Sequence, residues 1–579
     1  MPWAFSGIFR WQSDATGTPT GNGGAPVIFA HRNLTLFQEG KLPAPVFIGT
    51  YGCVFGYLFD RQAADARVLR FDPDEVERII SSNGQHLLTR YWGAYVAIWQ
   101  EPTREALTCL RDPSGMIPCY LIRRSDCVFF ASDAGAFRNL TPRPRPDWAG
   151  LRRFLYAHEL KSRQTALQDV AEVLPGERIR CDETQSKAEM AWSPWDFTRR
   201  HTNATPEALA DAVAAEVDRV VKAWRSAVAR PVLSLSGGLD SSVLAASLAR
   251  TGQEWSALNM AYADAGSDER DYAGEVAAAY EVPLFRATHH LSDVNSTVAT
   301  SGHLPRPLGH AFGQSQSKTR QAYLDAEGAD ALFVGEGGDN VFAYMQSATP
   351  VVDRYLIEGP RGAWQTVLDI SDMTRTSVWT VMRLAAARWQ RHDPRYVWTG
   401  DASLLSPATE ASLATLPLSH PWLEAPPGAL PGEATHISML LRIQGTLDAG
   451  PARHRPTIIA PLLSQPLLEL CLGIPSWRWC QGGINRSLVR RGFAGRLPQR
   501  VLWRVSKGGA NVFCMDVIER DRPLLCAHLC DGRLAHAGLL DVTRIEAVLT
   551  SKAPIPSPLH LRISQLAEAE AWVRHWEAD

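Results

Sequence analysis

Cysteine is scarce and scattered in this sequence. Ten cysteines occur among 579 residues, and no two of them form a C-x-x-C pair, so neither a zinc ribbon nor a redox dithiol is indicated. Cys526 and Cys530 lie one helical turn apart with His528 and His536 nearby, a spacing that suits a metal site or, by the interpretation we favour, one face of a helix. We expect the thiols to be reduced and to pack mostly as small apolar groups.

Long apolar runs and a large net charge are also missing. No run reaches membrane-spanning length, and Met1-Pro2-Trp3-Ala4 does not begin a signal peptide. The formal charge of −2 gives no electrostatic reason to expect a polyanionic partner. We therefore expect a cytoplasmic protein that binds neither a membrane nor a nucleic acid.

The length of the chain exceeds what one hydrophobic core supports. Polar residues interrupt the pattern between 199 and 205, and Thr205-Pro206 resembles a helix N-cap followed by proline in the first turn. A helical pattern from 206 to about 227 then leads into an apolar run at Val232. We predict two domains, spanning residues 1–200 and 201–579.

The first two hundred residues contain short strand-like runs separated by polar or glycine-containing connections. This spacing is typical of layered antiparallel sheets. The predicted strands are residues 5–11, 54–59, 92–99, 107–111 and 128–131.

The stretch SGGLDSS at 236–242 lies where an apolar strand ends and a helical pattern, 241–250, begins. Its glycines let the backbone approach an anion, and its serines and the helix N-terminus offer donors. The stretch lacks the lysine of a G-x-x-x-x-G-K-[ST] loop, which argues against a kinase or GTPase. It predicts a phosphate-binding loop, although an ordinary strand-to-helix turn has similar residues.

A second apolar strand, 331–334, runs into GEGGDNVF at 335–342. In a parallel sheet both loops would lie at the carboxyl ends of the strands, where ligands bind. Asp240 and Asp339 would then share Mg²⁺, which needs only one or two carboxylates besides phosphate oxygens and water. The alternative is that Asp339 only caps a turn.

These motifs, in this order, resemble the asparagine synthetases, ATP-dependent enzymes that release AMP and pyrophosphate. SGGLDSS resembles their pyrophosphatase loop, and GEGGDNVF resembles S-G-E-G-x-D-E-V-F. Residues 461–463 and 502–508 stand for P-F-L-D and L-W-R-P-K-x-G. The earlier stretches 111–120, 130–133 and 174–176 resemble the R-D-x-x-G-x-x-P-L-Y-Y, F-A-S-E and L-P-P-G of the glutamine amidotransferase domain that precedes the synthetase.

This resemblance covers nearly the whole chain and implies an α/β fold. The first domain would be a class II glutamine amidotransferase-like, Ntn-hydrolase-like domain of layered antiparallel β-sheets. The second would be a parallel-sheet synthetase domain of the adenine nucleotide α-hydrolase type.

The resemblance also implies site residues. Met260, in the strand 257–262 that we predict as the middle strand, would lie against adenine or simply fill the core. Lys507 would point at the transferring phosphates, with an ambiguity of one residue because Ser506 occupies the usual lysine position. Glu336 is a candidate catalytic base, and His310 is another. The predicted nucleotide-binding residues are Leu235, Ser236, Gly237, Gly238, Asp240, Ser241, Ser242, Met260, Val334 and Gly335, and Asp240 and Asp339 are the predicted metal ligands.

One departure from the family bears on the source of the amine. Glutamine-hydrolysing domains of this class use a cysteine at the first position of the processed chain as nucleophile, but residue 2 is proline and the first cysteine is Cys53. We expect a glutaminase-inactive scaffold, as in relatives that bring their own amine, such as β-lactam synthetases and lasso peptide cyclases.

Weaker signals resemble the lasso peptide cyclases most. Asn340 replaces an acidic residue of the asparagine synthetases, and the stretches 336–347, 420–423, 432–444 and 507–509 also resemble cyclases. None is a site by itself, because residues such as His436 and Trp422 are more often part of a core. The segment 404–432 suggests a long loop or short helices that either cover a peptide or fill the surface.

The implied function is an ATP- and Mg²⁺-dependent, AMP-forming ligase that adenylates an Asp or Glu side chain of a precursor peptide. The peptide's N-terminal amine would then close an isopeptide ring. The family implies a leader-binding protein and a leader peptidase as partners. The alternatives are an ammonia-dependent asparagine synthetase, a β-lactam synthetase and a nucleotide-binding scaffold without activity; a tRNA-modifying pyrophosphatase is disfavoured because no basic module is evident.

Overall fold

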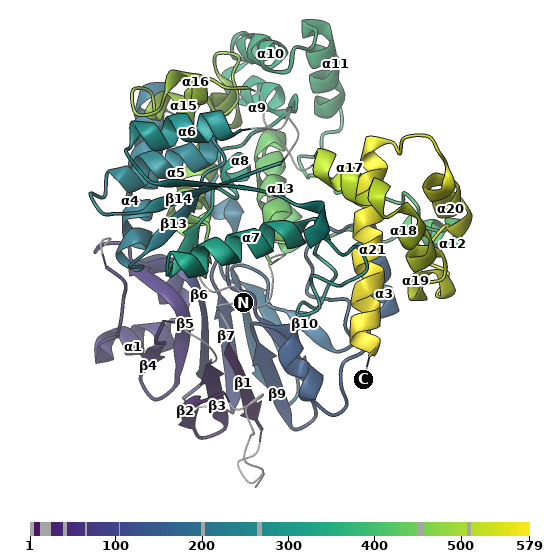
Figure 1. The fold of residues 1–579 in the computed structure, drawn as a ribbon. Coiled ribbons are helices and arrows are strands. Elements are labelled where there is room, and N and C mark those ends of the chain that lie inside the picture. The colour runs from purple at the N-terminus through teal and green to yellow at the C-terminus, as the bar shows by residue number, and fades with distance from the viewer. Residues whose placement is uncertain are drawn as a thin grey trace.

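The computed structural model describes residues 5–11, 25–38, 43–63, 66–102, 105–198, 203–262, 269–448, 457–505 and 511–578. Figure 1 shows two antiparallel sheets in the lower half of the view and a parallel sheet among helices above them. The last helices of the chain stand at one side of both halves.

The N-terminal half contains two six-stranded antiparallel sheets, ordered β10-β8-β9-β1-β3-β2 and β12-β11-β7-β6-β5-β4. β5 and β6 pair from Gly52↔Trp99 to Asp60↔Tyr91, and every residue of β6 is buried. The predicted layered antiparallel architecture is confirmed. The strands are β1 Phe5–Arg10, β2 Val27–His31, β3 Leu34–Gln38, β4 Val46–Ile48, β5 Gly52–Asp60, β6 Tyr91–Gln100, β7 Ala106–Arg111, β8 Tyr120–Arg123, β9 Cys127–Ala131, β10 Val170–Glu172, β11 Glu177–Asp182 and β12 Ser186–Met190, with helices α1 Pro73–Ser81, α2 Gln85–Arg90, η2 Ala134–Asn139, α3 Trp148–Tyr156 and η3 Pro194–Phe197.

The C-terminal half contains a five-stranded parallel sheet ordered β15-β14-β13-β16-β17. The predicted parallel sheet is confirmed, but the strand predicted to be the middle one, β14, lies second from an edge and β13 is central. The order cannot be deduced from the chain because β16 joins β13 on the side away from β14. The strands are β13 Pro231–Ser234, β14 Ser256–Ala261, β15 Leu284–Thr288, β16 Ala331–Phe333 and β17 Thr457–Ile459.

The C-terminal half contains many helices, some around this sheet and others at one side of it. They are α4 Pro206–Ser226, α5 Leu239–Ala249, α6 Arg270–Ala279, η5 Leu291–Asp293, α7 Gly313–Ala326, α8 Gly338–Val341, α9 Thr349–Glu358, α10 Pro360–Thr374, α11 Val378–Trp389, α12 Pro407–Leu413, η6 Pro421–Leu423, α13 Pro431–Thr446, η7 Pro461–Leu463, α14 Gln465–Leu472, η8 Ser476–Cys480, α15 Ser487–Gly492, α16 Gln499–Leu502, α17 Asn511–Arg520, α18 Arg522–Cys530, α19 Arg533–His536, α20 Val542–Thr550 and α21 Ser557–Glu577. α12 and η6 are the short helices of the segment 404–432, and Cys526 and Cys530 lie on α18, one helix as predicted.

The start of α4 has the predicted capping residues. The Thr205 hydroxyl oxygen accepts a hydrogen bond of 3.2 Å from the amide of Ala208, and Pro206 stands in the first turn. Such a cap satisfies an amide that the helix leaves without a partner. α4 then runs to Ser226 and delivers the chain to the central strand β13.

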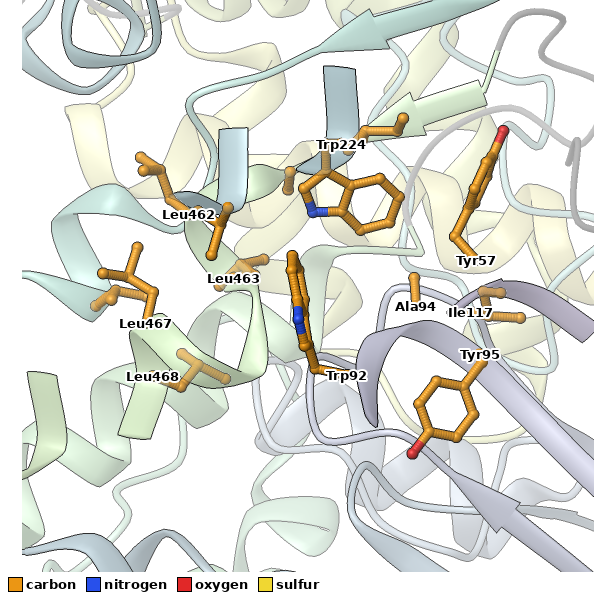
Figure 2. Packing of buried hydrophobic residues seen from close by; sticks show 14 of the residues in the cluster. Tyr57, Trp92, Ala94, Tyr95, Ile117, Trp224, Leu462, Leu463, Leu467 and Leu468 are labelled. Atoms are coloured by element: carbon orange, nitrogen blue, oxygen red, sulfur yellow. The ribbon is translucent and has the colours of Figure 1, made fainter. Parts of the chain in front are cut away.

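One continuous core joins the two halves. Trp224 of α4 lies among aromatic rings of the second antiparallel sheet, with centroid distances of 5.4 Å to Tyr57 and 5.1 Å to Phe59. Figure 2 shows Trp224 beside Trp92 of β6 and the leucines of η7 and α14. The indole nitrogen of Trp224 donates to the hydroxyl of Ser464 at 2.9 Å, which satisfies its polar group in the core.

A second cluster forms where the last helices pack against α3 and neighbouring strands. Arg562 of α21 donates to the carbonyl oxygen of Leu155 at 2.7 Å, so the C-terminal helix also contacts the N-terminal half. Within the described ranges, no helix has the length and apolarity needed to cross a bilayer.

Candidate active site

The first predicted phosphate loop connects β13 to α5 and is fixed by its own hydroxyl groups. The Ser236 hydroxyl accepts from the amide of Gly238 at 3.2 Å and lies 3.1 Å from the Ser241 hydroxyl. Gly237 has φ = +80°, and a side chain there would lie 2.7 Å from the backbone nitrogen of Ala273 in α6. A glycine is therefore required for both the backbone conformation and the space.

The second loop packs directly onto the first. A side chain added at Gly338 would lie 2.4 Å from the Cγ of Asp240, and one at Gly335 would lie 2.9 Å from the amide nitrogen of Ser241. The glycines of this loop are thus the reason that its backbone can approach Asp240 so closely. The two motifs, far apart in sequence, form one site at the carboxyl ends of β13 and β16.

α13 holds the second loop in place. Asn340 donates through Nδ2 to the carbonyl oxygen of Met439 at 2.7 Å. His436 is buried, and its Nε2 lies 3.0 Å from the carbonyl oxygen of Val341. Because a carbonyl only accepts, Nε2 carries the proton, and burial lowers the pKa of His436 to about 4. A neutral His436 is a buried support of the loop, and Asn340 has the same role.

Asp240 and Asp339 meet at a third residue, Arg486, which lies just before α15. Its Nη1 is 2.9 Å from Oδ1 and 3.0 Å from Oδ2 of Asp240, and 2.6 Å from Oδ1 of Asp339. The two predicted metal ligands therefore flank a single nitrogen atom. Arg486 could not be predicted from the sequence, because nothing in the local pattern of its segment distinguishes it from the other arginines nearby.

Arg486 is a buried cation in an unusual backbone conformation. It has φ = +52°, and its guanidinium carbon lies 5.2 Å from the centre of the Tyr344 ring. Burial alone would lower its pKa, but the charges of Asp240 and Asp339 raise the pKa above its usual value. The arginine thus remains charged and neutralises part of the negative charge of the loops.

Asp240 and Asp339 supply only two of the ligands that a magnesium ion takes. Within the described residues, no group of three or more His, Cys, Asp or Glu side chains is placed to hold a metal. Mg²⁺ does not need such a group, since it is commonly bound by one or two carboxylates, substrate phosphates and water. Asp240 and Asp339 flank one cationic nitrogen, so the donor chemistry of the site fits a shared cation.

Met260, predicted to lie against adenine, is on a strand beside the loops, and Val334, predicted to bind the nucleotide, directly follows another strand. Met260 is half-buried in β14, and Val334 is buried, with its amide donating to the carbonyl oxygen of Ile459 at 2.9 Å. Asn259 was not among the predicted residues; its side chain is buried and donates to the carbonyl oxygen of Leu235 at 2.8 Å. Asn259 ties β14 to the residue that opens the first loop. Leu235 is itself buried.

Glu336 and Lys507 are the predicted catalytic residues that are not predicted metal ligands. Glu336 is exposed at the second loop, and it faces the charge of Arg320 in α7. Burial lowers the pKa of Arg320, and the negative charge of Glu336 opposes this shift. Lys507 lies outside the described residues. Just before it, Arg504 pairs with Glu269 at 2.9 Å and covers the ring of Tyr272, with its guanidinium carbon 4.0 Å from the ring centre.

Of the other candidates, His310 is half-buried and Trp422 lies in the interior. His310 lies beside Phe312 and Ser564, and burial with the nearby His158 lowers its pKa to about 4. A proton acceptor so weakly basic is a poor general base at neutral pH. Trp422 is fully buried, with its ring centre 5.4 Å from that of Trp192.

Comparison with protein families decides the identity of the C-terminal half. Residues 208–574 match the asparagine synthase family model, which is more than half of the chain. The chain belongs to the asparagine synthase family. A glutamine amidotransferase domain model matches residues 61–192. This member of the family is therefore an ATP-dependent, amide-forming ligase with an amidotransferase-like N-terminal domain.

Comparison with solved structures adds little to the family match. A glutamine phosphoribosylpyrophosphate amidotransferase from B. subtilis, complexed with ADP and GMP, is 12% identical and covers 57% of this chain and 84% of its own, with a TM-score of 0.21. A structure described as the allosteric regulatory enzyme of purine biosynthesis is 10% identical, with 57% and 83% coverage and the same TM-score. No curated protein matches significantly.

Proposed function

We propose that this ligase is a lasso peptide cyclase. A side-chain carboxylate of Asp or Glu in a precursor peptide attacks the α-phosphate of ATP and forms an acyl-adenylate with release of pyrophosphate. The N-terminal amine of the same peptide then attacks the acyl carbon, AMP leaves, and an isopeptide bond closes a macrolactam ring. A free carboxylate is a poor electrophile, and its conversion into the mixed anhydride makes this attack favourable.

The state of the cysteines in the N-terminal domain carries the proposal. A glutaminase of this class needs an accessible thiolate. All cysteines of the described residues before 200 are buried, and burial raises the pKa of the Cys53, Cys127 and Cys181 thiols. Such thiols are unreactive. An amine supplied by the substrate itself fits a domain that contains no reactive thiol at these positions.

The proposal gives each loop residue a role. Ser236, Gly237, Gly238, Ser241 and Ser242 would hold the pyrophosphate of ATP with hydroxyl and backbone donors. Asp240 and Asp339 would hold Mg²⁺, which when bound neutralises phosphate charge and supports departure of pyrophosphate. Positioning and electrostatic stabilisation of this kind are the main contributions in phosphoryl-transfer chemistry.

An exposed face of α11 fits a polypeptide substrate. Trp379, Met382 and Trp389 recur at helical spacing and are 77%, 38% and 44% exposed, while only Val381 and Ala385 of this helix are buried. α11 contains arginine but no carboxylate, and in Figure 1 it stands at the end of the molecule away from the antiparallel sheets. The precursor peptide is the polypeptide that the reaction must bring to this chain, so we assign the face to an acidic, apolar segment of it.

The partners and the cellular location are part of the same proposal. A leader-binding protein would deliver the precursor peptide, and a leader peptidase would expose the attacking amine. The reaction consumes ATP, and none of the ten cysteines, all of which are described, forms a disulfide. These features fit the reducing environment of the cytoplasm.

Mass spectrometry tests the reaction. A candidate linear core peptide is incubated with the enzyme, ATP and Mg²⁺, in parallel with free aspartate and ammonia. We expect the peptide to lose one water while AMP accumulates, and we expect neither change with Asp240→Ala. Formation of asparagine instead would identify an ammonia-dependent asparagine synthetase, and absence of any AMP would leave a nucleotide-binding scaffold.

A further inference from the structure

We infer that Arg486 occupies the cation position between Asp240 and Asp339 when no nucleotide is bound, and that it yields this position to the magnesium–nucleotide complex. The inference rests on the ATP-dependent part of the proposed function and is independent of the peptide substrate. It makes Arg486 a positioning residue that controls when the metal site can fill.

The geometry makes the arginine and the metal competitors. The same Nη1 atom contacts both oxygens of Asp240 and one oxygen of Asp339. Mg²⁺ binds oxygen ligands at about 2.0–2.1 Å and with strict geometry. A second cation held by the same oxygens would repel the ion at short range. Metal binding therefore requires the guanidinium to release at least part of its contact with the aspartates.

The charge balance explains why a cation is needed in the first place. Asp240 is largely buried, and Asp339 lies beside it across one nitrogen atom. Two carboxylates that face each other in a poorly solvated site repel unless one is protonated or a cation lies between them. Arg486 supplies that cation within the protein. The aspartates can thus stay ionised and together before any nucleotide arrives.

The segment around Arg486 anchors its backbone and leaves its side chain as the exchangeable part. The neighbouring Arg490 is buried and donates to the carbonyl oxygen of Asn485 at 2.9 Å and to that of Arg504 at 3.0 Å. These bonds connect the start of α15 to the chain before residue 506. Arg490 thus bonds to backbone carbonyl oxygens, with its charge near Asp240 and Asp339, whereas Arg486 contacts both aspartates directly.

The ring of Tyr344 lies beside the guanidinium group that would move in this exchange. It lies 5.2 Å from the guanidinium carbon, a distance suited to a cation–π contact, and its amide donates to the carbonyl oxygen of Asp339 at 2.8 Å. This bond fixes the backbone of Tyr344 relative to the second loop. When the phosphates of a nucleotide enter, the guanidinium can turn from the aspartates to them as a phosphate ligand.

Binding of Mn²⁺ in the absence of nucleotide tests the inference. Removing the competing cation with Arg486→Met should tighten Mn²⁺ binding about tenfold or more, as measured by electron paramagnetic resonance of the free ion. Adding Asp339→Asn to that variant should reverse the gain. Arg491→Met, in the helix α15 that follows Arg486 but paired with Glu207 at 3.8 Å, is the matched control and should bind Mn²⁺ like the wild type.

A second measurement covers the case in which Arg486→Met does not fold. Arg486→Gln keeps polar contacts but no charge, and should also bind Mn²⁺ more tightly, whereas Arg486→Lys should bind it like the wild type. Pyrophosphate should increase the Mn²⁺ affinity of the wild type by a larger factor than that of Arg486→Gln, because it relieves the competition only where arginine is present.

The outcomes separate this inference from the proposed function. Unchanged or weaker Mn²⁺ binding in a folded, neutral variant would overturn the competition and leave Arg486 as an ordinary ion-pair partner. The expected Mn²⁺ results together with failure to cyclise any peptide would reject the cyclase and preserve the inference. A wild type that binds no Mn²⁺ even with ATP would reject the shared-cation site itself.

Discussion

Lys161 of the N-terminal domain forms an ion pair with Asp448 at the end of the synthetase helix α13, with Nζ 2.5 Å from Oδ2. Both side chains are buried, and Lys161 also lies 3.3 Å from Glu172. Arg111 and Arg306 complete the network by pairing with Glu172 from the two halves of the chain. Five buried charged groups thus join the domains, in addition to the apolar core around Trp224.

Glu172 is the central group of this network and offers a stability prediction. Glu172→Gln would leave its three cationic partners buried with one remaining carboxylate, so it should lower the free energy of unfolding by about 3 kcal/mol or more in urea. The control Glu189→Gln removes an exposed partner of Arg178 and should change it by less than about 1 kcal/mol. Equal effects of the two substitutions would contradict the role of the network.

The same carboxyl group predicts a pH dependence. Burial alone would raise the pKa of Glu172, but Lys161, Arg306 and Arg111 hold it well below its usual value of 4.5. A depressed carboxyl pKa stabilises the fold above the unfolded-state value and loses that contribution as the pH falls through the folded-state value. Acidification from about pH 5 to about pH 3 should therefore destabilise the wild type more than Glu172→Gln.

Substitution of the loop aspartates should lower the reaction rate and leave the fold intact. Asp240→Asn and Asp339→Asn should each lower pyrophosphate release at saturating Mg²⁺ by about 100-fold or more, because the site loses a ligand for the cation that stabilises phosphate charge. Asp211→Asn, on the exposed face of α4, is the control and should keep the wild-type rate. If either loop variant turned over at the wild-type rate, the substituted aspartate would not be part of the active site.

Features encoded within short segments could be predicted from the sequence. The two glycine loops follow apolar strands directly, and the cap at Thr205 depends on the adjacent Pro206 and Ala208, so local chemistry was sufficient. Each loop also requires a glycine with positive φ, as Gly237 and Gly337 show.

Contacts between distant segments could not be predicted in the same way. Arg486 contacts Asp240 although the two residues are 246 positions apart in the chain. The local sequence does not distinguish Arg486 from the many other arginines. The prediction that β14 is the middle strand was wrong for a related reason, since strand order depends on the side of the sheet on which each crossover adds the next strand. The network around Lys161 was missed because its members become neighbours only after both domains have folded.

Lys507 remains the predicted phosphate-facing lysine, and its substitution tests that role. Lys507→Ala should leave binding of ATP and peptide largely intact while turnover falls, because the cation acts on charge that develops as pyrophosphate departs. Lys552→Ala, an exposed lysine after α20, is the matched control. Normal turnover of Lys507→Ala, followed in a single-turnover AMP assay, would shift the role to another cation such as Arg504.

The exposed face of α11 predicts an effect on the peptide alone. Replacing Trp379 and Trp389 with serine should raise the KM for the precursor peptide about tenfold, since large aromatic side chains dominate the energy of such contacts. The Kd for ATP, measured by calorimetry, should not change. Leu69→Ser, which removes a similarly exposed apolar side chain from the N-terminal domain, controls for general surface effects. If the double variant processed peptide with an unchanged KM, the substrate would have to bind elsewhere, and the arginines of α11 would need another explanation.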